Sequence, residues 1–157
     1  MPASGAFVPV PQPDPAAVYA QAPPLAAEVE WFHSRLVEGI QATESRPDDR
    51  IDLLRWAALA DRLVEAAHEQ VEAYGRDRGP AAVGAWDALL DTQWDLEGAH
   101  QVLEAYDAAH GTRLGSHVTG DYGLMLVGAC GYIRQEYAAW TAMGCPASRS
   151  HKRRGSG

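Results

Sequence analysis

The chain has 157 residues, a formal net charge of −8, 46% hydrophobic residues and 22% charged residues. This is the size of one domain with a buried core, and the negative charge excludes nucleic acid as a partner for the body of the protein. The longest apolar run, residues 123–133, is too short for a membrane span, which needs ~20 residues. No secretory signal is visible and two cysteines make no disulfide framework, so we expect a cytoplasmic protein without a membrane partner.

The two ends of the chain differ in composition from the middle. Residues 1–24 are rich in alanine and carry prolines at positions 2, 9, 11, 13, 15, 23 and 24, which predicts an extended arm. A helical turn within 16–22 could dock Val18 and Tyr19 onto the rest of the protein. Residues 145–157 are small and basic, and we expect a flexible, disordered tail there.

Apolar residues at steps of three and four predict two helices in the first half of the remaining chain, over 25–43 and 48–74. The face of the first is formed by Leu25, Val29, Phe32, Leu36 and Ile40. The face of the second is formed by Leu53, Trp56, Ala60, Val64, Ala67, Val71 and Tyr74. A short loop joins the second helix to the next one, so these two should be antiparallel neighbours.

The third predicted helix, 80–110, is the longest and has two apolar stripes where a surface helix normally has one. The first stripe is Ala85, Leu89, Leu96, Ala99, Leu103 and Tyr106. The second is Val83, Trp86, Leu90 and Trp94. We therefore predict that the second stripe, together with Trp31 of the first helix, forms an interface with another protein or a second copy.

A glycine-containing loop precedes the fourth predicted helix, 121–143. Its apolar face is Tyr122, Leu126, Ala129, Ile133, Tyr137 and Trp140. The glycines at its start leave open a strand over 124–127 instead. Four helices with short connections over 25–144 predict an all-α domain, and an up-down-up-down four-helix bundle is the simplest architecture.

Glu and His three residues apart recur on three of the predicted helices. The pairs are Glu30 with His33, Glu65 with His68, and Glu97 with His100. Composition predicts only ~0.4 such pairs by chance, and Glu and His at this spacing lie on one helical face and can reach one ion. In an up-down-up-down bundle the first and third pairs fall at one height, where Asp61 and Glu136 are the nearest carboxylates.

This arrangement resembles the ferritin-like di-metal carboxylate bundles, in which two helices each supply Glu-x-x-His and two supply one carboxylate. The family places its paired motifs on the second and fourth helices, and Asp61 stands where Glu is usual. The resemblance implies a site for two irons or two manganeses with oxygen chemistry. Its ligands would be Glu30, His33, Asp61, Glu97, His100 and Glu136.

Two functions therefore stay open at this point. The first is protein–protein association, as a homo-oligomer such as a homodimer or with a partner, which needs no cofactor. The second is the di-metal oxidase or oxygenase. In a metal-free protein His33 and His100 would be histidines at the rim of their apolar faces, and the glutamates would be solvated or paired with arginine.

Overall fold

The computed structural model describes residues 13–41, 50–114 and 125–145, and the fold is all-α as predicted. Its helices are α1 (Pro15–Val18), α2 (Leu25–Gln41), α3 (Arg50–Tyr74), α4 (Pro80–His110) and α5 (Met125–Ala142). The strand alternative is wrong for residues 125–127, which belong to α5. The predicted tail from 146, residues 1–12 of the arm and the outermost residues of three predicted helices lie outside the described residues.

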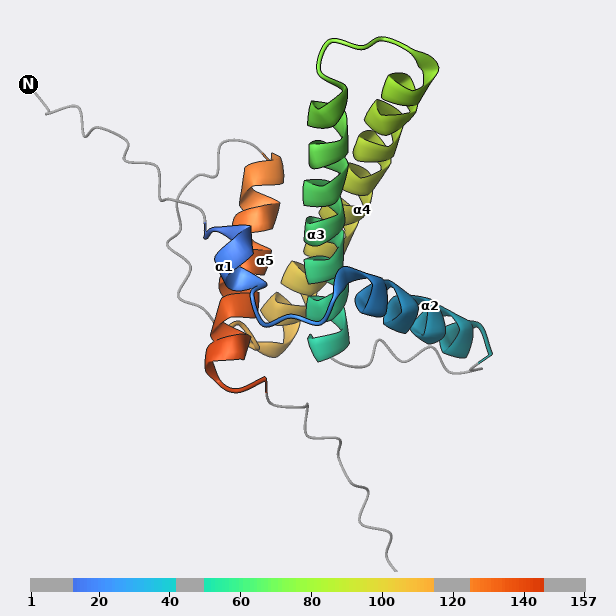
Figure 1. Cartoon of the computed structure of the whole chain (residues 1–157). Helices are drawn as coiled ribbons and strands as arrows, with labels where there is room; N and C mark the ends of the chain where they lie inside the picture. The colour runs from blue at the N-terminus through green and yellow to red at the C-terminus, as the bar shows by residue number, and fades with distance from the viewer. Residues whose placement is uncertain (1–12, 42–49, 115–124, 146–157) are drawn as a thin grey trace, which may run out of the picture.

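The helices α3 and α4 form a long antiparallel hairpin that organises the molecule (Figure 1). Gly75, with φ +57°, ends α3 in the left-handed region that favours glycine, and Pro80 opens α4 at a first helical position. α5 packs beside the lower part of the hairpin, with α1 against it (Figure 1). The upper part of the hairpin projects beyond the other helices in this view.

The core runs along the contact between α3 and α4 and continues where these two helices meet α5. Its fully buried side chains include Leu54, Leu89, Leu96, Leu103 and Ile133. Small residues of α3 and α4, among them Ala57 and Ala99, are also inaccessible to solvent, and small side chains allow helices to approach closely. The first stripe of α4 and the described residues of the α5 face, which begin at Ala129, thus pack in or against the core, as their periodicity predicts.

α2 crosses the lower end of α3 at a steep angle and then leads away from the hairpin (Figure 1). Its main ring contact is Phe32, stacked on Trp56 of α3 with centroids 6.2 Å apart. Leu36, predicted on the buried face of α2, is 49% exposed. α2 is therefore a flanking helix on α3, and among the described side chains of its apolar face those before Leu36 are partly covered.

α1 lies within the arm that the sequence predicts to be extended. Asp14 caps it by accepting a hydrogen bond from the backbone N–H of Ala16, and Pro15 occupies its first turn. The expected docking is confirmed, because Val18 and Tyr19 pack against the core. Tyr19 also meets Tyr137 of α5 edge-to-face at 5.1 Å. Of the described helices, none is long and apolar enough to cross a membrane.

Replacing Gly111 by alanine should lower the free energy of unfolding by about 1 kcal/mol. Gly111 ends α4 at φ +63°, and its N–H bonds the carbonyl of Asp107. A Cβ placed there meets nothing within 4 Å, so the cost is backbone strain alone. Urea titration followed by circular dichroism measures it. Gly111→Asn should cost less, because asparagine tolerates this conformation better, whereas equal costs for both variants would contradict the explanation.

Candidate functional site

The six residues of the predicted metal site lie in different surroundings. Glu30 and His33 are exposed on α2, which crosses α3 instead of running along α4 (Figure 1). His100 and Glu97 are partly buried on α4. Asp61 and Glu136 are fully buried, on α3 and α5.

Asp61 is held by a tyrosine and an arginine that come from distant parts of the chain. Its Oδ2 accepts hydrogen bonds from the Tyr19 hydroxyl at 2.6 Å and from Arg134 Nε at 2.8 Å, and its Oδ1 accepts from Arg134 Nη2 at 2.9 Å. Arg134 Nη2 also pairs with Glu65 at 2.9 Å. We call Tyr19, Asp61, Glu65 and Arg134 the Asp61 cluster. It joins α1, α3 and α5.

The pKa shifts agree with a paired, closed Asp61 cluster. Burial, followed by the charge of Asp61, raises the pKa of Tyr19, so its hydroxyl remains a donor. Burial also raises the pKa of Cys130 to about 12, with Asp61 as the next contributor. A cysteine that stays a thiol near neutral pH is a poor nucleophile and a poor metal ligand. The cluster therefore has the character of a structural ion pair.

Glu136 belongs to a second buried group, formed around Asp107. Arg50 donates to both carboxylate oxygens of Asp107, and its Nη2 lies 3.1 Å from Glu136 Oε1. The backbone N–H of Leu114 is 3.0 Å from each oxygen of Glu136. The hydroxyls of Thr112 and Tyr132 donate to Asp107 at 2.7 Å each. The Asp107 cluster, defined as Arg50, Asp107, Thr112, Tyr132 and Glu136, ties the start of α3 to the end of α4 and the middle of α5.

His100 turns toward α5 and toward its own helix. Its ring meets Tyr132 edge-to-face at 5.4 Å, and its Nε2 lies 3.2 Å from Glu104. Burial lowers the pKa of His100, although Glu104 and Glu97 oppose the shift. Glu97 accepts a long hydrogen bond of 3.5 Å from Gln101 one turn along α4.

The structure therefore does not bring the six predicted ligands together. In the part of the chain that it describes, no three His, Cys, Asp or Glu side chains are grouped as a metal ion would require. The two carboxylates expected at the centre, Asp61 and Glu136, are each paired with an arginine. This geometry gives the di-metal alternative no support.

The predicted interface residues of α4, in contrast, form a continuous exposed row. Val83, Trp86, Leu90 and Trp94 are 52%, 48%, 50% and 73% exposed, and they recur at steps of three and four residues. We call these four residues the α4 stripe. Trp31 is not part of it, because it lies on α2 under the guanidinium of Arg55, 3.8 Å from the ring centroid. Arg55 in turn pairs with Glu28, a buried carboxylate.

Sequence reasoning missed the partners in both buried clusters. An arginine such as Arg134, placed between the buried residues Ile133 and Glu136 on an apolar helix, is the signal that could have pointed to a buried ion pair. The sequence around Asp61 does not indicate that Arg134 and Tyr19 are its partners, because these residues are 73 and 42 positions away. Searches with this chain return no matching protein-family model, curated protein or solved structure.

Proposed function

We propose that this protein acts by protein–protein association through the α4 stripe, with no catalytic role. The observation that supports it is the exposure of two tryptophans and two aliphatic residues in one row. Trp86 and Trp94 alone leave roughly 300 Å² in contact with water, taking ~250 Å² for a whole tryptophan. A patch of a few hundred Å² on one face is typical of an interaction site, and tryptophan is enriched among residues that dominate binding.

The position of the α4 stripe favours a helical partner. Its residues lie in the first half of α4, which begins at the loop that joins α3 to α4 (Figure 1). A helix laid along α4 there would place its own apolar residues, spaced three and four apart, against the stripe. Such a helix would complete a three-helix packing around the projecting hairpin.

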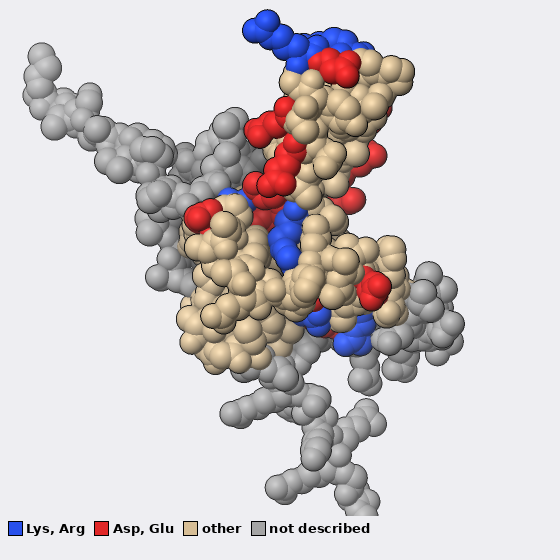
Figure 2. Space-filling model, viewed as in Figure 1, with Lys and Arg blue, Asp and Glu red and all other residues tan. Residues whose placement is uncertain are grey.

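The charges beside the stripe indicate which kind of helix fits. α4 contains no lysine or arginine, and Asp87 and Asp91 line one edge of the stripe, about 100° round the helix from Trp86 and Leu90. Figure 2 shows acidic side chains along the hairpin, with basic ones gathered at its tip. In an antiparallel pair of two copies these aspartates would face their own counterparts, which is repulsive. We therefore propose a partner helix with lysine or arginine beside its apolar residues.

A designed peptide can test this proposal before a natural partner is known. We expect an amphipathic helix with leucine anchors and lysine flanks to bind the full chain, and binding to weaken as salt screens the charges. Replacing Trp94 by alanine should reduce its affinity at least ~10-fold, in line with a central tryptophan anchor. Isothermal titration calorimetry measures both effects. Val102→Ala is the matched control, since Val102 is an exposed residue of α4 outside the stripe.

Two further measurements decide whether a partner helix or a second copy of the chain covers the α4 stripe. A peptide with the same composition but a scrambled order of apolar residues should bind weakly. If it binds as tightly as the designed peptide, the binding is only a general attraction of a basic peptide to an acidic protein. Light scattering should show a monomer at low salt. A dimer that high salt strengthens and Leu90→Asp dissociates would instead identify a second copy as the occupant. A monomer that binds the designed peptide no more tightly than the scrambled one would contradict the proposal.

A further inference from the structure

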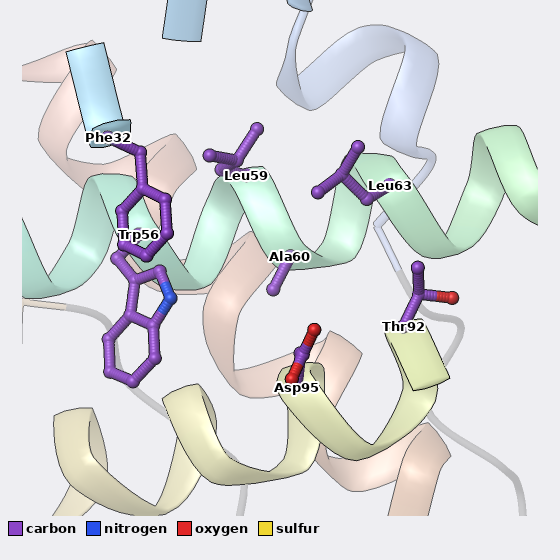
Figure 3. Close-up of a pocket in the computed structure, with 7 residues that line it drawn as sticks. All are labelled: Phe32, Trp56, Leu59, Ala60, Leu63, Thr92 and Asp95. Atoms are coloured by element: carbon purple, nitrogen blue, oxygen red, sulfur yellow. The ribbon is translucent and has the colours of Figure 1, made fainter. Parts of the chain in front are cut away.

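A small pocket lies between α2, α3 and α4. Its volume is about 180 Å³. The described residues that line it are Phe32, Trp56, Leu59, Ala60, Leu63, Thr92 and Asp95. Figure 3 shows the stacked rings of Phe32 and Trp56 at one end, with Thr92 and Asp95 on the α4 side. The pocket is thus a mainly apolar hollow with a hydroxyl and a carboxylate on its α4 wall.

The size and the lining require a ligand with a compact apolar body. A dry cavity of ~150 Å³ lined by aliphatic and aromatic side chains is large enough to hold benzene. The pocket is slightly larger than that, and Leu59 and Leu63 face it with Ala60 between them (Figure 3). One aromatic ring or a branched alkyl group of similar size therefore fits.

The polar groups at the pocket favour a ligand whose apolar body carries a positive charge. Asp95 is the single charged residue among the described lining residues, and no arginine or lysine of the described chain pairs with it. The nearby arginines of α3 have other partners: Arg55 holds Glu28, and Arg62 donates to the Pro23 carbonyl. Thr92 gives its hydroxyl proton to the Leu89 carbonyl and so offers only lone pairs to a ligand.

The aromatic end of the pocket is compatible with the same ligand. The Phe32 and Trp56 planes are nearly parallel, 6° apart. An apolar ring can extend this stack, and the faces of aromatic rings also attract an ammonium group. The indole nitrogen of Trp56 is turned toward the pocket (Figure 3), so a ligand can carry one acceptor as well.

We propose that this pocket binds a small organic ammonium ion whose body is a single aromatic ring or a branched alkyl group. The apolar body would lie against α3 and the two rings, and the ammonium group would donate to Asp95 and Thr92. This inference is independent of the association proposed for the α4 stripe. It uses other side chains and needs no protein partner.

The probe for this site is 4-fluorobenzylammonium, observed by fluorine NMR with the full chain. We expect it to bind more tightly than 4-fluorobenzyl alcohol, which has the same body without charge, and 4-fluorobenzoate to bind least. Asp95→Asn should weaken binding of the ammonium about 3- to 5-fold, which is the upper part of the range for a solvent-exposed ion pair. The same variant should leave binding of the alcohol unchanged, so the preference for the cation disappears.

Three controls place the probe in the pocket. Asp91→Asn removes an equal charge one turn away that does not line the pocket, and should leave the affinity unchanged. Leu90→Ser should also have no effect, which separates this site from the α4 stripe. Ala60→Leu should fill the pocket and weaken both the ammonium and the alcohol, provided that circular dichroism shows it folded. No saturable binding by the wild type, equal affinity for alcohol and ammonium, or equal losses in Asp95→Asn and Asp91→Asn would each overturn the proposal.

Discussion

Replacing Asp61 by alanine should lower the free energy of unfolding by about 4 kcal/mol. Asp61 is fully buried, and the side chain of Arg134 that pairs with it is 6% exposed. Removing the carboxylate leaves the guanidinium buried. Its remaining hydrogen-bond acceptors are Glu65 and, at the longer distance of 3.5 Å, the Pro13 carbonyl. Breaking a buried pair from one side is costly because the remaining charge stays without its main counter-charge.

Two further variants separate this electrostatic cost from simple loss of packing. Tyr19→Phe removes only the hydroxyl that donates to Asp61 and should cost about 1 kcal/mol. The double variant Asp61→Leu with Arg134→Met removes both charges and should be much more stable than Asp61→Ala, because buried pairs can often be replaced by apolar residues. Urea unfolding followed by circular dichroism measures all three. A double variant less stable than Asp61→Ala would show that the pair itself stabilises the fold.

Replacing Asp107 by asparagine should cost about 3 kcal/mol at neutral pH and should reduce the sensitivity of the protein to acid. Burial alone would raise the pKa of Asp107, but hydrogen bonds from Arg50, Tyr132 and Thr112 outweigh it and place the pKa below the ordinary 3.8. The stability that this carboxylate contributes is therefore present above its unfolded pKa. It is lost as the pH falls toward and through the lower folded pKa.

His100 adds to the same acid sensitivity at higher pH. Burial lowers its pKa below the ordinary 6.5, so the unfolded chain binds a proton more readily than the folded one. Stability should therefore begin to fall as the pH drops through the unfolded pKa of histidine. His100→Gln should remove this first step, and Asp107→Asn the steeper loss at lower pH.

The measurement is the free energy of unfolding across a pH series for the wild type and both variants. Asp87→Asn serves as the control for Asp107→Asn, since it removes an exposed carboxylate from the same helix. We expect the control to follow the wild type within about 0.5 kcal/mol, as surface substitutions usually do. If Asp107→Asn and Asp87→Asn have the same pH profile, the Arg50 pair does not carry the acid sensitivity.

The long helices and most of the core can be predicted from the sequence alone. The four long helices and the main faces of α4 and α5 follow from apolar residues at steps of three and four, which is a local property of the chain. The α4 stripe was predictable for the same reason, because a second apolar row on one helix can be read without knowing its neighbours. Its exposure in the structure agrees with the interface prediction, which stays a prediction together with the cytoplasmic location.

The roles of the charged residues, in contrast, depend on contacts that form only when the helices pack together. Asp61 has the same local surroundings whether it binds a metal, faces water or pairs with an arginine, and the choice depends on Arg134 and Tyr19, which lie far away in the chain. The steep crossing of α2 likewise determines that His33 and Glu30 stay in solvent and that Phe32 closes a pocket with Trp56. Periodicity specifies which face of a helix is buried. The angle and height at which two helices meet depend on the packing of all their neighbours, and that information is not local.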